Sequence, residues 1–97
     1  MKKVINGRTY NTKTSLEIAS YYNQKIGHDV LEETLYLTKK GDYFLYYYGG
    51  GLTKYAISVA NNQISESKGI KVLTEKQAKN FIEKYRDNDY FVIYKEI

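Results

Sequence analysis

Two strand-forming runs around a short polar loop are the feature that most limits how this chain can fold. Residues 33–38 and 43–48 are rich in β-branched and aromatic side chains, which favour strands. The loop between them, Lys39-Lys40-Gly41-Asp42, fits a three-residue type I turn with a G1 bulge, in which the glycine takes a positive φ. The sequence therefore predicts a β-hairpin in the middle of the chain.

The register of this hairpin decides which side chains share a face. The three-residue turn pairs Leu37 with Tyr43. The next pair on that face is Leu35 with Leu45, so the face is largely aliphatic. A two-residue Lys40-Gly41 turn would instead mix aliphatic and tyrosine side chains on both faces, and we therefore expect the first register. The opposite face then carries an aromatic strip formed by Tyr36, Phe44, Tyr46 and Tyr48.

Turn residues predict further strands at both ends of the chain. Asn6-Gly7 is a strong two-residue hairpin signal between residues 2–6 and 8–10. Asn61-Asn62 marks another turn. Tyr90 to Tyr94 alternates between apolar and polar residues in the manner of a closing strand.

Capping signals predict two helices. Thr14 and Glu17 have the spacing of a capping box, which predicts a helix from about Ser15 to Asn23. Thr74 and Gln77 repeat that spacing before a second helix. The apolar residues of the second helix follow at i, i+3, i+4 and i+7: Ala78, Phe81, Ile82 and Tyr85.

These elements together predict an α+β fold, with an antiparallel sheet of about four to six short strands built from hairpins and with two α-helices. A chain of 97 residues can bury one modest core, so residues 1–97 are expected to form a single domain. Gly49-Gly50-Gly51 breaks the central strand run. We interpret it as a flexible turn, because no phosphate-loop pattern follows it.

The charge of the chain is mildly basic. Fifteen Lys and Arg against eleven Asp and Glu give a formal net charge of +4, and the basic residues are scattered as on an ordinary solvated surface. The excess argues against mimicry of DNA by an array of carboxylates. The chain has no cysteine, and its N-terminal apolar run is too short for a signal peptide or a membrane span. We therefore expect a soluble, cytoplasmic protein with no membrane partner.

Side chains suited to catalysis are sparse. The only imidazole is His28, and its neighbour Asp29 is too close in sequence to orient it as a catalytic triad requires. The clustered acids, Glu32-Glu33 and Asp87-x-Asp89, are interpreted as solvated acids or helix caps rather than metal ligands. We therefore predict no enzymatic activity, no metal and no cofactor.

Tyrosine is the outlier of the composition, with 12 residues beside three Phe and no Trp. Tyrosine gives contact area at low entropic cost, and its ring can stack on unpaired bases. We assign Tyr22, Tyr43 and Tyr85 to packing. The aromatic strip is either an exposed interface or a second half-core under a helix. If it is exposed, the predicted interaction surface is Tyr36, Lys39, Lys40, Phe44, Tyr46, Tyr48 and Lys54.

The order of several motifs along the chain resembles a known family. The motifs, from Lys3 to about Tyr85, are Ile5-Asn6-Gly7-Arg8-Thr9-Tyr10-Asn11-Thr12, Ile18-Ala19, Tyr22-Asn23, Glu33-Thr34-Leu35-Tyr36, Lys39 to Tyr46, Gly49-Gly50, Lys54-Tyr55-Ala56, Leu73-Thr74-Glu75 and Ala78-Lys79. This order is similar to that of small proteins carried by phages and integrative mobile genetic elements of Gram-positive bacteria, several of which are type II anti-CRISPR proteins. The motifs are structural turns and aromatic strands, not catalytic signatures.

The resemblance implies an inhibitor that acts in the bacterial host cell by binding the RNA-guided nuclease of a type II CRISPR system. Such a nuclease holds nucleic acid in a positively charged channel, which a protein of charge +4 is poorly suited to fill. We therefore expect direct binding to a domain surface, or to bound guide RNA or DNA, and not DNA mimicry.

Two other functions stay open at this point. One is a nucleic-acid-binding accessory protein that uses Lys39, Lys40, Lys54 and nearby tyrosines on single strands. The other is a self-associating structural protein in which an exposed strand pairs with a second copy. The expected oligomeric state is accordingly a monomer or a homodimer.

Overall fold

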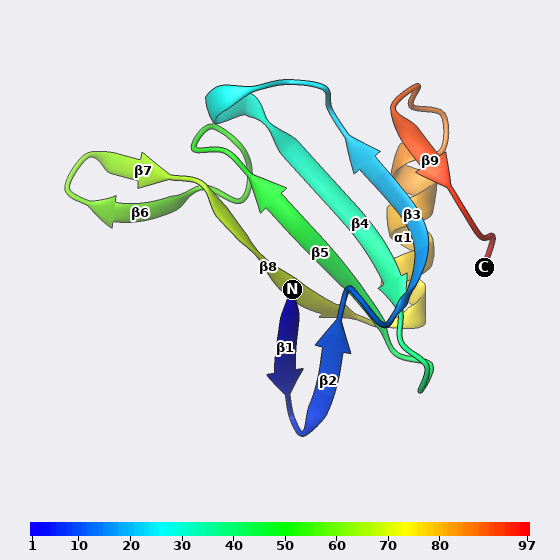
Figure 1. Ribbon diagram of the computed structural model, residues 1–97. Coiled ribbons are helices and arrows are strands. Elements are labelled where there is room, and N and C mark those ends of the chain that lie inside the picture. The colour runs from blue at the N-terminus through cyan, green and yellow to red at the C-terminus, as the bar shows by residue number, and fades with distance from the viewer.

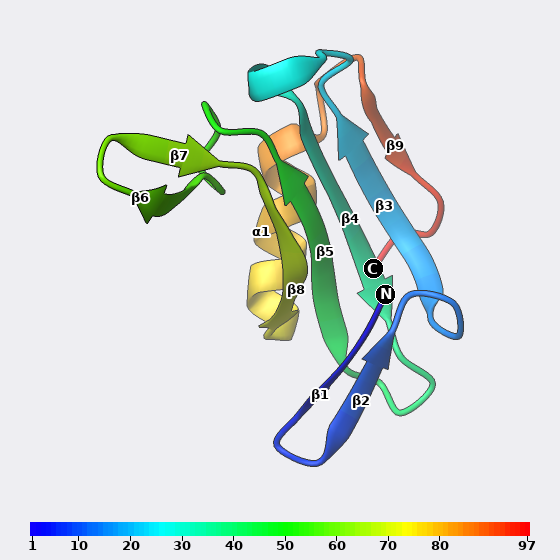
Figure 2. The ribbon, with the colours of Figure 1, turned by 60° about the vertical axis from the view of Figure 1, so that its left-hand side comes forward.

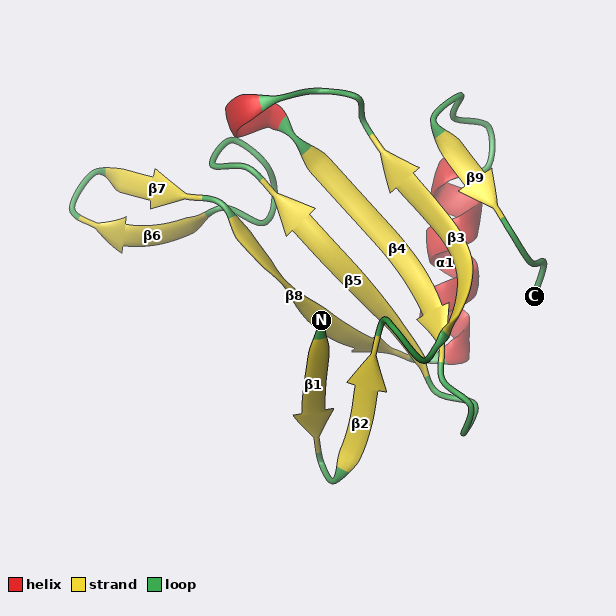
Figure 3. Cartoon of the chain, viewed as in Figure 1, coloured by secondary structure: helices red, strands yellow, loops and turns green.

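The computed structural model describes residues 1–97, and its strands and single α-helix are shown in Figures 1 and 3. In chain order the elements are β1 (Lys2–Ile5), β2 (Arg8–Asn11), β3 (Leu16–Tyr22), a 3-10 turn (Gly27–Asp29), β4 (Leu31–Leu37), β5 (Tyr43–Gly49), β6 (Ile57–Ala60), β7 (Gln63–Ser65), β8 (Ser67–Leu73), α1 (Glu75–Tyr85) and β9 (Phe91–Ile93). The predicted α+β class is confirmed. No helix is long and apolar enough to cross a membrane.

Five strands form the main sheet, in the order β8-β5-β4-β3-β9, and every neighbouring pair is antiparallel. The other four strands form two separate hairpins, β1–β2 and β6–β7. Helix α1 lies on one face of the main sheet, and the β1–β2 hairpin lies against the other face (Figure 2). The β6–β7 hairpin projects beyond the sheet (Figure 1).

The central hairpin has the predicted register. Leu37 pairs with Tyr43, and Leu35 pairs with Leu45. The N–H of Thr38 donates to the carbonyl of Asp42 at 2.9 Å. Gly41 has a φ of +92°, which a residue with a Cβ adopts only with strain. The three-residue turn therefore fixes the aliphatic face of β4 and β5 as predicted.

Helix α1 covers that aliphatic face. Its capping box is complete, because Thr74 Oγ1 accepts from the N–H of Gln77 at 3.1 Å and the Gln77 side chain accepts from the N–H of Thr74 at 2.8 Å. The four apolar residues predicted for the helix are all buried. Burial of each large side chain contributes about 1.5–3 kcal/mol. The main core is Ile18, Ala19, Leu35, Leu45, Ala78, Phe81, Ile82 and Tyr85.

The prediction of a first helix is wrong, because residues 16–22 form strand β3 and the capping signal at Thr14 and Glu17 is not used. A β-bulge between Glu17 and Ala19 interrupts the alternation of the strand. Ile18 and Ala19 are therefore adjacent in sequence yet both fully buried. This local loss of the two-residue period gave the segment an apolar pattern that looks helical.

The β1–β2 hairpin forms a second, smaller core on the opposite face of the sheet. Asn6 and Gly7 have φ values of 51° and 77°, as a two-residue hairpin turn requires. Tyr10 meets Phe44 edge to face, with ring centroids 5.6 Å apart. Ile70 completes this buried cluster. The hairpin therefore covers one end of the face that carries the predicted aromatic strip.

Three local predictions need correction. The glycine run is a turn only from Gly51 onward, because Gly49 ends β5 and the N–H of Gly50 donates to the carbonyl of Val30 at 2.9 Å. Tyr22 was assigned to packing, but it is 38% exposed because it follows the bulge onto the outer face. Glu33 was expected to be solvated, but it is 1% exposed because it shares the inward face of β4 with Leu35.

Candidate interaction surfaces

A group of tyrosines gathers on the face of the main sheet opposite α1. Cross-strand partners in a sheet share a face. Tyr48 pairs with Glu32, which pairs on its other side with Tyr22. The hydroxyl of Tyr94 lies 3.3 Å from Oγ of Ser20, on the same face. We call this surface the tyrosine face and define it by Tyr22, Glu32, Tyr36, Tyr46, Tyr48 and Tyr94.

The β1–β2 hairpin divides the predicted aromatic strip into a covered end and an open end. Phe44 is fully buried under the hairpin, and the ring of Tyr36 stacks on it with centroids 5.1 Å apart. Tyr46 and Tyr48 lie beyond the hairpin and are half-buried. A cavity of about 390 Å³ opens beside Tyr46, under the edge of the hairpin at Thr12. The strip is therefore core at Phe44 and surface at Tyr46 and Tyr48.

Two carboxylates without an ion-pair partner lie here: Glu32 on the tyrosine face, and Glu17, the cross-strand partner of Tyr36. Lys68, the cross-strand partner of Tyr48, lies on the same face. Partial burial raises the pKa of the Tyr36 and Tyr46 hydroxyls, and the negative charge of Glu32 raises the pKa of both further. Both hydroxyls therefore stay protonated at neutral pH and can donate hydrogen bonds. A surface of this kind combines flat apolar rings, hydroxyl donors and charges of both signs.

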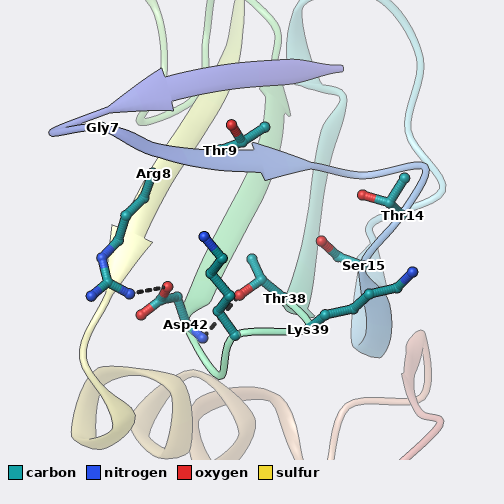
Figure 4. Close-up of a pocket in the computed structure, with 9 residues that line it drawn as sticks. Gly7, Arg8, Thr9, Thr14, Ser15, Thr38, Lys39 and Asp42 are labelled. Atoms are coloured by element: carbon teal, nitrogen blue, oxygen red, sulfur yellow. Dashed lines mark hydrogen bonds and ion pairs between the residues drawn. The ribbon is translucent and has the colours of Figure 1, made fainter.

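A polar cleft separates the β1–β2 hairpin from the loop between β4 and β5 (Figure 4). It has a volume of about 200 Å³, and no hydrophobic side chain lines it. Nη1 of Arg8 donates to Oδ2 of Asp42 at 2.6 Å, which joins the hairpin to the loop. Lys39 and Lys40 also line the cleft, and both are exposed and without an ion-pair partner.

Lys54 lies on the other face of the sheet, away from the tyrosine face. Its Nζ is 2.9 Å from Oε2 of Glu33, whose side chain points from β4 toward α1. The Glu33 carboxylate also accepts hydrogen bonds from the hydroxyls of Tyr55 and Tyr85. One buried carboxylate is therefore shared by the sheet, the last turn of α1 and the segment that follows β5.

The donors around Glu33 control its ionisation. Burial alone would raise the pKa of Glu33, but the hydrogen bonds from Tyr55, Tyr85 and Lys54 together hold it below its usual value. In turn, burial and the bonded carboxylate raise the pKa of both tyrosine hydroxyls well above the usual value of a phenol. The network therefore consists of an ionised carboxylate, two neutral phenols and an ammonium.

The structure brings together part of the predicted interaction surface and separates the rest. Tyr36, Tyr46 and Tyr48 share the tyrosine face, whereas Phe44 is buried beneath the hairpin. Lys39 and Lys40 lie at the loop beyond the end of β4, and Lys54 lies on the helix side. Sequence reasoning missed four residues that the structure places at these surfaces: Tyr22, Glu33, Tyr55 and Tyr94.

The residues considered for catalysis do not converge. His28 is an exposed residue of the 3-10 turn. No three His, Cys, Asp or Glu side chains come together in a way that could hold a metal ion.

No family model, no curated protein and no solved structure matches this chain.

Proposed function

We propose that this protein inhibits the RNA-guided nuclease of a type II CRISPR system by binding to the nuclease through the tyrosine face. The observation that carries the proposal is the open end of the aromatic strip, where Tyr46 and Tyr48 keep part of their surface exposed, unlike the fully buried Phe44. Tyrosine is enriched at protein interfaces, because it supplies contact area while few rotatable bonds become fixed. The motif order that resembles type II anti-CRISPR proteins supports the same target.

The tyrosine face carries charges of both signs, since Lys68 is the cross-strand partner of Tyr48, and its free carboxylates can contact basic side chains of a partner. Glu17 and Glu32 are free to pair with lysine or arginine. A nuclease that holds nucleic acid in a positive channel offers such side chains around that channel. Two carboxylates on a protein of net charge +4 do not make a copy of a phosphate backbone. The proposed mechanism is therefore occlusion of a nuclease domain by direct contact, not DNA mimicry.

The test is a DNA-cleavage assay with several type II nucleases, together with a pull-down. We expect inhibition and co-elution with at least one nuclease, and we expect the double variant Tyr46→Ala, Tyr48→Ala to lose both. Tyr90→Ala is the matched control, because Tyr90 is 53% exposed but lies outside the tyrosine face. If no nuclease is inhibited or captured, or if the double variant inhibits as well as the wild type, the proposal is wrong.

Two other functions make different predictions in the same experiments. A nucleic-acid-binding accessory protein would bind oligonucleotides with affinity that falls steeply with salt, but it would neither co-elute with a nuclease nor inhibit one. A self-associating structural protein would show a mass above that of the monomer in size-exclusion chromatography with light scattering. The proposed inhibitor instead forms a complex with the nuclease that persists at moderate salt, because apolar contacts contribute most of its affinity.

A further inference from the structure

A third cavity, separate from the tyrosine face, lies on the helix side of the sheet. It has a volume of about 240 Å³ and is open to solvent between α1, the edge strand β8 and the segment after β5. Each of these three elements contributes one lysine, namely Lys84, Lys71 and Lys54. We call this cavity the lysine pocket.

The sequence positions explain why these side chains meet. Lys71 pairs with the core residue Leu45, so its side chain leaves β8 on the helix side of the sheet. Gln77, Asn80 and Lys84 are spaced by three and four residues and therefore form one stripe along α1. This stripe faces the lysine on β8 across the pocket.

The buried network around Glu33 fixes the third lysine in place. The Glu33 carboxylate lies in the wall of the pocket and holds Nζ of Lys54 at 2.9 Å. The same carboxylate accepts from Tyr55 and Tyr85, so its negative charge is already shared among three donors. A buried carboxylate is expensive to maintain, and such groups mark candidate functional sites when they border a cavity. Here it holds the Lys54 ammonium at the pocket wall.

Positive charge exceeds negative charge in the lysine pocket. Three ammoniums line it, and Glu33 is the only acidic residue among the lining side chains. Partial desolvation and the neighbouring Lys54 lower the pKa of Lys84. The Lys84 ammonium also lies 5.1 Å from the centroid of the Tyr85 ring, which keeps it near the pocket wall. An anion placed between these lysines would relieve their mutual repulsion.

We propose that the lysine pocket binds a phosphate group of a single-stranded nucleic acid. Lysine binds phosphate as a point charge, and ammoniums arriving from three elements suit a tetrahedral group with oxygens in several directions. A carboxylate partner would be better served by the planar fork of arginine, which the pocket lacks. The amides of Gln77 and Asn80 add neutral donors at the rim, and Leu73 and Phe81 offer an apolar floor for a sugar.

The test measures binding of a short single-stranded RNA oligonucleotide by fluorescence anisotropy at several salt concentrations, and binding of inorganic phosphate by NMR. We expect Lys71→Gln with Lys84→Gln to weaken RNA binding about tenfold and to reduce the salt slope by about one for each lysine removed. Lys76→Gln with Lys79→Gln is the matched control. Both of these lysines are exposed on α1 and lie outside the pocket. The control therefore removes the same charge but should leave the salt dependence of RNA binding unchanged.

Each outcome decides the proposal. Saturable shifts of the Asn80 and Gln77 side-chain amides with inorganic phosphate and with RNA support a phosphate site. Equal losses in both double variants would show that net charge alone causes binding, and displacement of RNA by poly-glutamate at matched ionic strength would show a carboxylate site. Either result, or an absence of binding by the wild type, overturns the proposal.

The lysine pocket and the proposed nuclease inhibition are separable. Tyr46→Ala with Tyr48→Ala leaves every residue of the pocket intact, so we expect this variant to bind RNA as the wild type does. Loss of inhibition without loss of RNA binding would therefore assign the two activities to opposite faces of the sheet.

Discussion

The hydroxyl of Tyr85 donates a hydrogen bond of 2.5 Å to the carboxylate of Glu33, 52 residues away in the sequence. This contact ties the middle strand of the sheet to the last turn of α1. Tyr55 donates to the other oxygen of the same carboxylate, and Lys54 pairs with that oxygen at 2.9 Å. One side chain thus holds together three parts of the fold, and its removal would leave desolvated donors behind.

Replacement of Glu33 by alanine should therefore be strongly destabilising. We expect a loss of about 1–3 kcal/mol in the free energy of unfolding for each of the two phenol donors, Tyr55 and Tyr85, that loses its acceptor. Glu32→Ala is the control, because Glu32 lies on the opposite face without an ion pair and should change stability by no more than about 0.5 kcal/mol. Urea denaturation of both variants measures the difference. Similar losses for the two would contradict the assignment of Glu33 to the buried network.

The same network predicts how stability depends on pH. The pKa of Glu33 is lowered in the folded state from its usual 4.5. The stability that Glu33 contributes is therefore complete above pH 4.5 and is lost as the pH falls through the lowered pKa. The pKa of Tyr55 and of Tyr85 is raised from 10.0, so their contribution is complete below pH 10 and is lost as pH rises further. We expect a stability plateau between these limits.

Thermal unfolding across the pH range tests this dependence. Glu33→Gln removes the ionisable group, so the fall in stability at acid pH should become shallower than in the wild type. Glu32→Gln removes a carboxylate that takes no part in the network. This variant should lose stability at acid pH as steeply as the wild type does. If Glu33→Gln loses as much stability at acid pH as the wild type, other carboxylates are responsible for the acid dependence.

The two ends of the aromatic strip should respond differently to truncation. Phe44 is fully buried beneath the β1–β2 hairpin, so Phe44→Ala should cost about 3–5 kcal/mol. Tyr46 is half-buried beyond the hairpin, and Tyr46→Ala should cost only about 1–2 kcal/mol, in proportion to the smaller area that it buries. Denaturant unfolding measures both values. A larger loss for Tyr46 than for Phe44 would mean that the open end of the strip is core.

Much of the fold follows from local chemistry, and the parts that do not have identifiable causes. Asn6-Gly7, Gly41 and the Thr74 capping box each act within a few residues, so they predicted two hairpins and α1 correctly. Strand β3 was missed because its bulge hides the two-residue period. A bulge is set by the packing of Ile18 against residues far away in sequence, which local patterns do not record.

The candidate site was predicted less completely, because its contacts are long-range. The partners of Glu33 are 22 and 52 residues away, so the sequence alone does not show that a carboxylate is accommodated there. The sequence did contain one indication. Glu33 lies two residues before Leu35 in the predicted strand, so the two side chains share a face and Glu33 points toward the core. The division of the strip at Phe44 depends on where the β1–β2 hairpin docks, which no local signal specifies.

Gly50 and Gly51 provide a matched pair for testing the close packing after β5. A Cβ added at Gly50 would overlap the backbone carbonyl of His28, which cannot move aside as a flexible side chain could. We expect Gly50→Ala to cost about 1–3 kcal/mol by overpacking. A Cβ at Gly51 would lie no closer than 3.5 Å to its neighbours, so Gly51→Ala should be tolerated. Equal melting temperatures for the two variants would contradict this difference.

The order of strands in the main sheet also has a kinetic consequence. β3, β4 and β5 follow one another in the chain and pair through short connections, whereas β9 returns from the far end of the chain to pair with β3. Distant pairings form late, because a long loop must be closed first. We expect the amides of β9 to become protected last in pulsed hydrogen exchange, and simultaneous protection with β4 would contradict this order. Until β9 pairs with β3, the unpaired edge of β3 can pair with a second nascent chain. Formation of β9 therefore also reduces aggregation during synthesis.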